Sequence, residues 1–254
     1  MKMFDQILEK KRLLERRKPY SLEVNKEISR LEMTALAASL FRTDGSRLTR
    51  YDVEGMLAGE IPPTATLREC VRIGAYERVL SAMRLYRDLS ADISDDIIAK
   101  LFEALTESDN MVRITSPVIY QWSHTPCHYQ DIGRNMAELM RWMASEGRPG
   151  TEGRLAGMSA AEAEPDDFVL RAAVFHLDLV SIYPFSEANT EMAWICTYYY
   201  LMCRGIGPFF IGMSEQEYND AVSAFIRTGD TAPMRSALER SIYNTLDQLI
   251  QLTE

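Results

Sequence analysis

Apolar side chains recur at helical spacing along almost the whole chain, and this periodicity is the strongest constraint on its fold. In the stretch 66–87, for example, Val71, Ala75 and Val79 are four residues apart and therefore share one helix face. No series of alternating apolar and polar residues indicates a sheet. We therefore predict an all-α protein, with helices over 3–17, 23–41, 49–58, 66–87, 92–106, 131–145, 166–181, 190–204, 214–228 and 232–252.

Two segments fall outside this pattern. Val112 to Tyr120 is rich in Val, Ile and Thr and includes Pro117, which favours an extended conformation. The stretch 146–167 is rich in Gly and Pro and is predicted to be the longest loop.

The composition excludes some classes of function. The chain has 254 residues, of which 46% are hydrophobic, and its formal net charge is -9. A nucleic-acid-binding protein needs a basic face, so we expect no nucleic-acid partner. No segment approaches the ~18 apolar residues of a membrane span, and residues 1–17 are charged rather than signal-like. We expect a cytoplasmic protein, although a secreted effector with a non-cleaved signal would have the same composition.

The cysteines and histidines do not predict a metal site. The four cysteines have no CxxC spacing, and Cys196 and Cys203 are seven residues apart, which suits buried, reduced thiols on one helix face. His124 and His128 have a spacing that suits one helix face, but Pro126 between them favours a loop.

The most informative stretch follows an apolar segment that contains His176. From Tyr183 it reads Tyr-Pro-Phe-Ser-Glu-Ala-Asn-Thr-Glu-Met-Ala-Trp. This stretch resembles the motif HPFx[D/E]GNGRxxR of Fic (Fido) domain protein adenylyltransferases. The matching residues are Pro184, Phe185, Glu187 and Asn189. The residues that differ are Tyr183 at the histidine, Ala188 and Thr190 at the glycines, and Glu191 and Trp194 at the arginines.

Weaker similarities occur in the family's order over most of the chain. They are Lys18 to Leu57 (the family's N-terminal helical region), 66–69 (an SLRE segment), 110–120 (the start of a "flap"), 205–211 and Tyr218. The resemblance implies a Fic-like helical bundle with a small β-hairpin flap near residues 112–125. It also implies an N-terminal helical region over 1–60, which contains a segment like the family's inhibitory helix, and a core domain over 61–254.

The resemblance also assigns roles, which include the transfer of AMP from ATP to a protein hydroxyl. In the family, the histidine is the base and the acidic residue binds Mg²⁺, while the asparagine, the glycine amides and the arginines hold the phosphates. Tyr183 thus occupies the base position and Glu187 the metal position. Asn189, Glu191 and Trp194 occupy ligand-binding positions, and Asp44 stands where autoinhibited members carry an inhibitory glutamate.

The residues present do not suit those roles. A phenol, with an unperturbed pKa near 10, is a poor base at neutral pH. Exchanging two arginines for Glu191 and Trp194 removes two positive charges and adds a negative one beside a polyphosphate. Each replacement also has a structural explanation: Tyr183 can pack its ring, Glu191 can stabilise a helix N-terminus behind Asn189 or Thr190 as a cap, and Asp44 with Gly45 can form a turn.

Three functions remain open at this point. The first is a pseudoenzyme that has lost AMP transfer and binds a protein partner, for which no cofactor is expected. The second is a diverged enzyme that uses the acidic pocket on another ligand. The third is a weakened nucleotidyltransferase that still requires Mg²⁺ and ATP.

Overall fold

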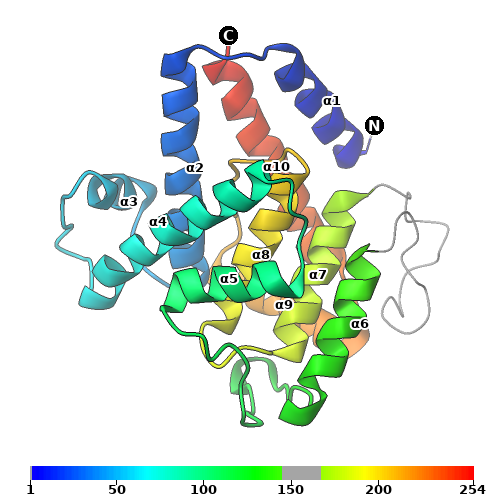
Figure 1. Cartoon of the computed structure of the whole chain (residues 1–254). Coiled ribbons are helices and arrows are strands. Elements are labelled where there is room, and N and C mark those ends of the chain that lie inside the picture. Colours follow the sequence, from blue (N-terminus) through cyan, green and yellow to red (C-terminus); the bar gives the residue numbers. More distant parts are fainter. Residues whose placement is uncertain (1, 145–166) are drawn as a thin grey trace.

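The computed structural model describes residues 2–144 and 167–254, and these residues form ten α-helices (Figure 1). The helices are α1 (Met3–Arg16), α2 (Leu22–Thr43), α3 (Arg50–Leu57), α4 (Leu67–Asp88), α5 (Asp95–Thr106), α6 (Ile132–Ala144), α7 (Phe168–Ile182), α8 (Asn189–Cys203), α9 (Glu215–Thr228) and α10 (Ala232–Leu252). The predicted all-α class is confirmed, and each predicted helix boundary lies within three residues of the observed one.

Local capping explains why the boundaries were predictable. Five helices begin after a Ser or Thr whose hydroxyl accepts a hydrogen bond from a backbone N–H in the first turn. These caps are Ser21, Thr49, Thr66, Ser94 and Ser214. Asp167 serves α7 in the same way, and it also forms an ion pair of 2.7 Å with Arg235 of α10.

Helix α8 lies at the centre of the molecule and contacts α2, α4, α5 and α7 (Figure 1). Every residue from Glu191 to Met202 is buried. A helix that is covered on all sides needs apolar side chains all round, which explains why this segment shows no polar face. The helix that begins inside the motif is therefore also the core of the fold.

Helix α1 packs along α10, and the two chain ends lie on the same side of the molecule (Figure 1). The predicted domain boundary at residue 60 falls in the loop between α3 and α4. Helix α2, before that boundary, contacts α4 and α8 after it.

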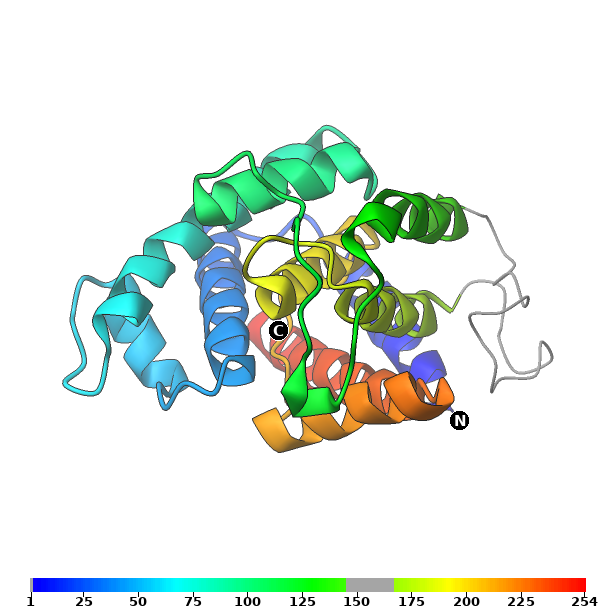
Figure 2. The same cartoon turned by 90° about the horizontal axis from the view of Figure 1, so that it is seen from below.

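The predicted β-hairpin flap near residues 112–125 is wrong. This segment contains a 3-10 turn (Tyr120–Trp122) and only isolated bridges, Val112 with Phe185 and Ile119 with His124. Figure 2 shows the segment crossing the molecule beside the loop that joins α7 and α8. The backbone N–H of Arg113 donates to Pro184 O at 3.1 Å, so the start of the segment pairs with the motif loop, and within the segment only Ile119 and His124 exchange backbone hydrogen bonds.

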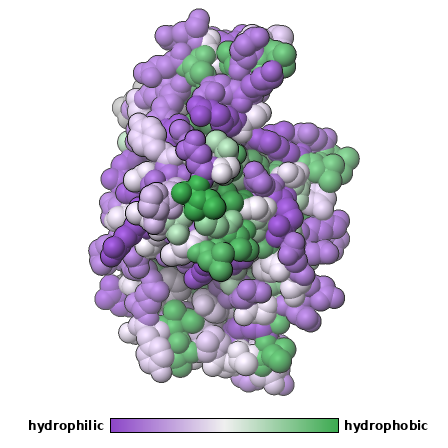
Figure 3. All heavy atoms as spheres, turned by 90° about the vertical axis from the view of Figure 1, so that its left-hand side faces the viewer, coloured by the Kyte–Doolittle hydropathy of each residue, from purple (hydrophilic) through white to green (hydrophobic). Residues whose placement is uncertain are grey.

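The surface on the left-hand side of the molecule in Figure 1 is mostly hydrophilic, with a hydrophobic group near its centre and smaller ones toward its edges (Figure 3). Exposed apolar side chains of α4 and the loop before it include Ile61, Leu67 and Val71. No helix among the described residues is long and apolar enough to cross a membrane. The loop predicted over 146–167 lies outside the described residues except for Asp167.

Candidate functional site

The motif loop joins the C-terminus of α7 to the N-terminus of α8, and two of its residues have left-handed backbone conformations. Tyr183 has φ 53° and Ala188 has φ 55°. A residue with a Cβ pays ~1–2 kcal/mol for this conformation, whereas glycine does not. Ala188 therefore adopts the left-handed conformation that a glycine at this motif position would adopt without strain.

Asn189 holds the loop in shape. Its side-chain Oδ1 accepts a hydrogen bond of 2.9 Å from the Phe185 N–H, and its Nδ2 donates one of 2.8 Å to the Phe185 carbonyl. Asn189 is the first residue of α8, and Ala188 is its N-cap without any side-chain bond, so neither Asn189 nor Thr190 caps the helix as the sequence suggested. The amide is buried and both of its polar atoms are used within the loop.

Arg113 stabilises the other end of the loop. The residue is only 4% exposed, and its guanidinium donates to the carbonyls of Ile182 (3.3 Å), Tyr183 (2.6 Å) and Cys127 (2.6 Å). A cation at a helix C-terminus interacts favourably with the free carbonyls and with the helix dipole. Arg113 thus neutralises the C-terminus of α7 at the point where the motif begins.

Glu191 stabilises the N-terminus of α8 with a negative charge, as Arg113 stabilises the C-terminus of α7 with a positive one. It lies in the first turn of α8, where a negative charge is favourable, and its side chain is only 5% exposed. Arg72 of α4 binds it bidentately, with Nε–Oε1 at 3.1 Å and Nη2–Oε2 at 2.7 Å. The Tyr76 hydroxyl donates to Oε1 at 2.7 Å. The acidic group at the arginine position is therefore neutralised by a cation from another helix.

Asp44 lies near this cluster, at the C-terminus of α2. Its Oδ2 is 3.3 Å from Nη2 of Arg68, and Gly45 follows it with φ 74° as the predicted turn requires. Burial raises the pKa of Asp44, and the nearby Glu191 carboxylate raises it further, while Arg68 and Arg72 oppose the shift. The inhibitory-segment position and the arginine position of the motif thus carry two acids that repel each other.

Trp194 is part of the core. It is 1% exposed, and its ring centroid lies 4.0 Å from that of His176 and 5.6 Å from that of Tyr218. The Thr197 hydroxyl donates to the Ala193 carbonyl at 2.7 Å, so its oxygen accepts from His176 Nδ1 at 3.2 Å. Burial lowers the pKa of His176 to about 3, which keeps the imidazole neutral.

That hydrogen-bond pattern also assigns the imidazole tautomer. Because Nδ1 carries the proton, Nε2 accepts from the Tyr218 hydroxyl at 3.1 Å. Both ring nitrogens are therefore occupied by buried partners.

Among the titratable residues of the motif, Tyr183 and Glu187 remain accessible. The Tyr183 side chain is partly buried, and burial raises the pKa of its hydroxyl, although the Arg113 guanidinium lowers it by a smaller amount. Glu187 is exposed at the surface of the loop. Within the described ranges, no three His, Cys, Asp or Glu side chains are grouped so that they could hold a metal ion.

The structure brings Asn189 and Glu191 together at the start of α8, with Asp44 nearby, while Trp194 points into the core and Glu187 into solvent. Sequence reasoning missed Arg72, Tyr76 and Arg113. A signal for Arg72 was available: it lies three and four residues before the buried Ala75 and Tyr76, on the apolar stripe of α4. A charged residue in such a stripe indicates a buried partner of opposite charge.

Comparison with known proteins agrees with this architecture. The model of the Fic/DOC family matches residues 82–201, which include the helices on both sides of the motif loop. Residues 82–201 are therefore similar to the Fic/DOC family. The arrangement of the helices extends this similarity beyond the matched residues, because the chain has the fold of Fic-domain proteins.

Three solved structures with this fold cover nearly the whole chain. Fic-1 (residues 134–508) from C. elegans is 16% identical with a TM-score of 0.74, and the match covers 98% of this chain and 71% of that one. A Fic-domain-containing signaling protein from Bacteroides thetaiotaomicron is 14% identical with a TM-score of 0.72, over 99% and 98% of the two chains. A Fic family protein from Desulfovibrio desulfuricans is 13% identical with a TM-score of 0.65, over 99% and 75%.

Proposed function

We propose that this Fic-fold protein has lost AMP transfer and acts as a pseudoenzyme that regulates or binds a protein partner. The observation that carries the proposal is the buried cluster of Glu191, Arg72 and Tyr76. At a position where the family has a phosphate-binding arginine, this chain has a carboxylate whose two oxygens are already bound by its own residues.

This cluster disfavours the binding of a nucleotide. A triphosphate drawn to the N-terminus of α8 meets the negative charge of Glu191 there. Drawing Arg72 away from Glu191 would leave a buried carboxylate without its cation, at a cost of about 3–5 kcal/mol. Asn189 is equally unsuited, because both polar atoms of its amide already bind the backbone of Phe185.

The remaining motif residues support the same proposal. The hydroxyl of Tyr183 has a raised pKa, so it is an even weaker base than a free tyrosine. Glu187 is exposed and belongs to no group of potential metal ligands in the described part of the chain. Tyr183 and Glu187 therefore do not fit the binding of Mg²⁺ and ATP or the transfer of AMP.

The alternative of a diverged enzyme with an acidic pocket is less well supported. That alternative depended on Glu187 and Glu191 both contributing negative charge to an open site. Glu191 is instead buried and neutralised, which leaves Glu187 as the exposed acid of the motif.

An exposed apolar segment beside the motif suits the binding of a protein partner. Ile114 is 81% exposed and Tyr120 is 87% exposed, and both belong to the segment that pairs with the motif loop through Arg113. Exposed aromatic and aliphatic side chains are common anchors at protein interfaces.

The loss of nucleotide binding is tested by calorimetry and thermal shift with ATP and Mg²⁺. We expect no heat of binding at micromolar affinity and no increase in Tm, and no labelled protein after incubation with labelled nucleotide and a lysate. A raised Tm that Glu187→Gln abolishes would overturn the proposal, because it would require a working metal position.

Partner binding is tested by affinity capture from a lysate of the organism that encodes the chain. A partner that binds beside the motif should be lost on the double change Ile114→Ser and Tyr120→Ser. Tyr51→Ser is the matched control, since Tyr51 is 82% exposed but lies on α3. Equal capture by all three proteins would contradict a role for this segment.

A further inference from the structure

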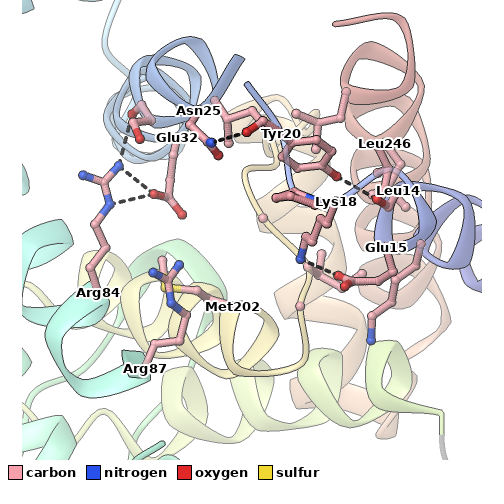
Figure 4. Close-up of a pocket in the computed structure, with 18 residues that line it drawn as sticks. Leu14, Glu15, Lys18, Tyr20, Asn25, Glu32, Arg84, Arg87, Met202 and Leu246 are labelled. Carbon is pink, nitrogen blue, oxygen red and sulfur yellow. Dashed lines mark hydrogen bonds and ion pairs between the residues drawn. The ribbon is translucent and has the colours of Figure 1, made fainter. Parts of the chain in front are cut away.

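A second candidate site lies at the other end of α8 from the motif. A cavity of about 840 Å³ opens between α1, α2, α4, α10 and the C-terminus of α8 (Figure 4). Because α8 has 15 residues, the two ends of the helix are ~22 Å apart. Small-molecule sites have volumes of ~300–1,000 Å³, so this cavity is of the right size.

The cavity has an apolar part. Leu14 of α1, Ile28 of α2, Met202 of α8 and Leu246 of α10 line it. Figure 4 shows Leu14 and Leu246 on one side and Met202 below the open space. These side chains offer a surface for the hydrocarbon part of a ligand, since burying such surface is favourable by ~25 cal/mol per Å².

The polar side chains around this surface carry a surplus of positive charge. Four basic and two acidic residues line the cavity, although the whole chain has a net charge of -9. Two of the basic residues pair with acids that line the cavity: Arg84 with the buried Glu32 at 2.7 Å, and Lys18 with Glu15 in a half-exposed pair at 2.7 Å (Figure 4). The other two are Lys11 and Arg87.

Lys11 is the cation that most clearly lacks a partner. Its ammonium forms no ion pair with any described residue, and it lies over the Phe168 ring, with Nζ 5.8 Å from the centroid. Its stem lies against Gly205, where a Cβ would approach Cε to 3.2 Å. Burial lowers the pKa of Lys11, Glu15 raises it, and Lys18 and Arg204 lower it further, so the site would be stabilised by an additional negative charge.

Arg87 contributes from the opposite wall. Its guanidinium points into the open space in Figure 4, while Nε and Nη2 also hydrogen-bond to the neighbouring Asp88 at 3.0 and 2.9 Å. Asp88 itself is exposed, so this contact is screened by solvent and binds the guanidinium weakly.

We propose that this cavity binds a small anionic amphiphile, whose carboxylate or phosphate group pairs with Lys11 while its hydrocarbon part covers the apolar wall and Arg87 adds to the positive charge of the cavity. The site is independent of the motif loop. It also connects the N-terminal helix α1 to the core, because α1, α2 and α10 each supply part of its lining.

The test uses calorimetric titration of the whole chain with three probes: octanoate, 1-octanol and inorganic phosphate. Octanoate should bind about tenfold more tightly than either other probe, since only it satisfies both the charge and the apolar wall. Lys11→Met should weaken octanoate binding about tenfold and leave 1-octanol unchanged. Arg87→Met should weaken octanoate binding by a smaller factor, because Arg87 lies on the opposite wall and adds positive charge without pairing with the carboxylate.

Arg12→Met is the matched control, because it removes one positive charge from an exposed position on the same helix. It should leave octanoate binding unchanged, and circular dichroism should show that all variants keep their helix content. Equal loss in Lys11→Met and Arg12→Met would overturn the proposal. So would equal affinity for octanoate and 1-octanol, competition by phosphate at the same concentration as octanoate, or no octanoate binding up to millimolar concentration.

Discussion

The buried contact between Arg72 and Glu191 makes a quantitative prediction about stability. The Glu191 side chain is 5% exposed, whereas that of Arg72 is 18% exposed. Arg72→Met would leave a buried carboxylate with the Tyr76 hydroxyl as its remaining side-chain donor. Leaving a buried charge unpaired costs about 3–5 kcal/mol, so we expect the free energy of unfolding to fall by that amount.

The reverse change should cost less, because Arg72 is closer to solvent. After Glu191→Gln, the amide oxygen can still accept from Tyr76, and the guanidinium can turn toward water. We expect a loss of about 1–2 kcal/mol for this variant. The double variant should be less destabilised than the sum of the two, with a coupling energy of about 2–3 kcal/mol.

The assay is urea unfolding followed by tryptophan fluorescence and circular dichroism, with coincident transitions as the check for two-state behaviour. Arg78→Met is the matched control on the same helix. Arg78 pairs with Glu107 at the surface, with side chains 45% and 73% exposed, so its loss should cost at most about 1 kcal/mol. A cost for Arg72→Met no larger than for Arg78→Met, or a coupling energy near zero, would refute the argument that the pair is a buried unit.

Three further predictions concern the motif and its support. The His176 pKa of about 3, against 6.5 in the unfolded chain, means that the unfolded state binds more protons below pH 6.5, so stability falls as the pH falls. At pH 5 the loss from this group is about 2 kcal/mol, and pH-dependent unfolding of His176→Gln should lack that component. Asn189→Ala removes two buried hydrogen bonds and should lower the free energy of unfolding by about 2–3 kcal/mol; a loss below that of an exposed Asn25→Ala change would contradict the loop-closing role. Ala188→Gly relieves the positive φ and should raise stability by about 0.5 kcal/mol, whereas a loss above 1 kcal/mol would show that Ala188 is not strained.

The fold was predictable from the sequence because its determinants are local. Helical spacing and Ser or Thr caps lie within a few residues of the helices that they define, so the ten helices were placed from short segments. The flap prediction failed for the opposite reason. The start of residues 112–125 pairs with Pro184 and Phe185, which lie some seventy residues away along the chain, and this leaves only the bridge between Ile119 and His124 within the segment.

For the candidate site, too, some features could be predicted from the sequence and others depended on the tertiary structure. The sequence alone determined which residues occupy the motif positions, and therefore that a carboxylate replaces an arginine at Glu191. Only the tertiary structure decided what that carboxylate does. Arg72 reaches Glu191 because α4 packs against α8, and a contact across 119 residues leaves no spacing pattern in the sequence. The charge reversal suggested an acidic site, but a partner from another helix neutralises it, since burying a charge is favourable only when its counterion is buried with it.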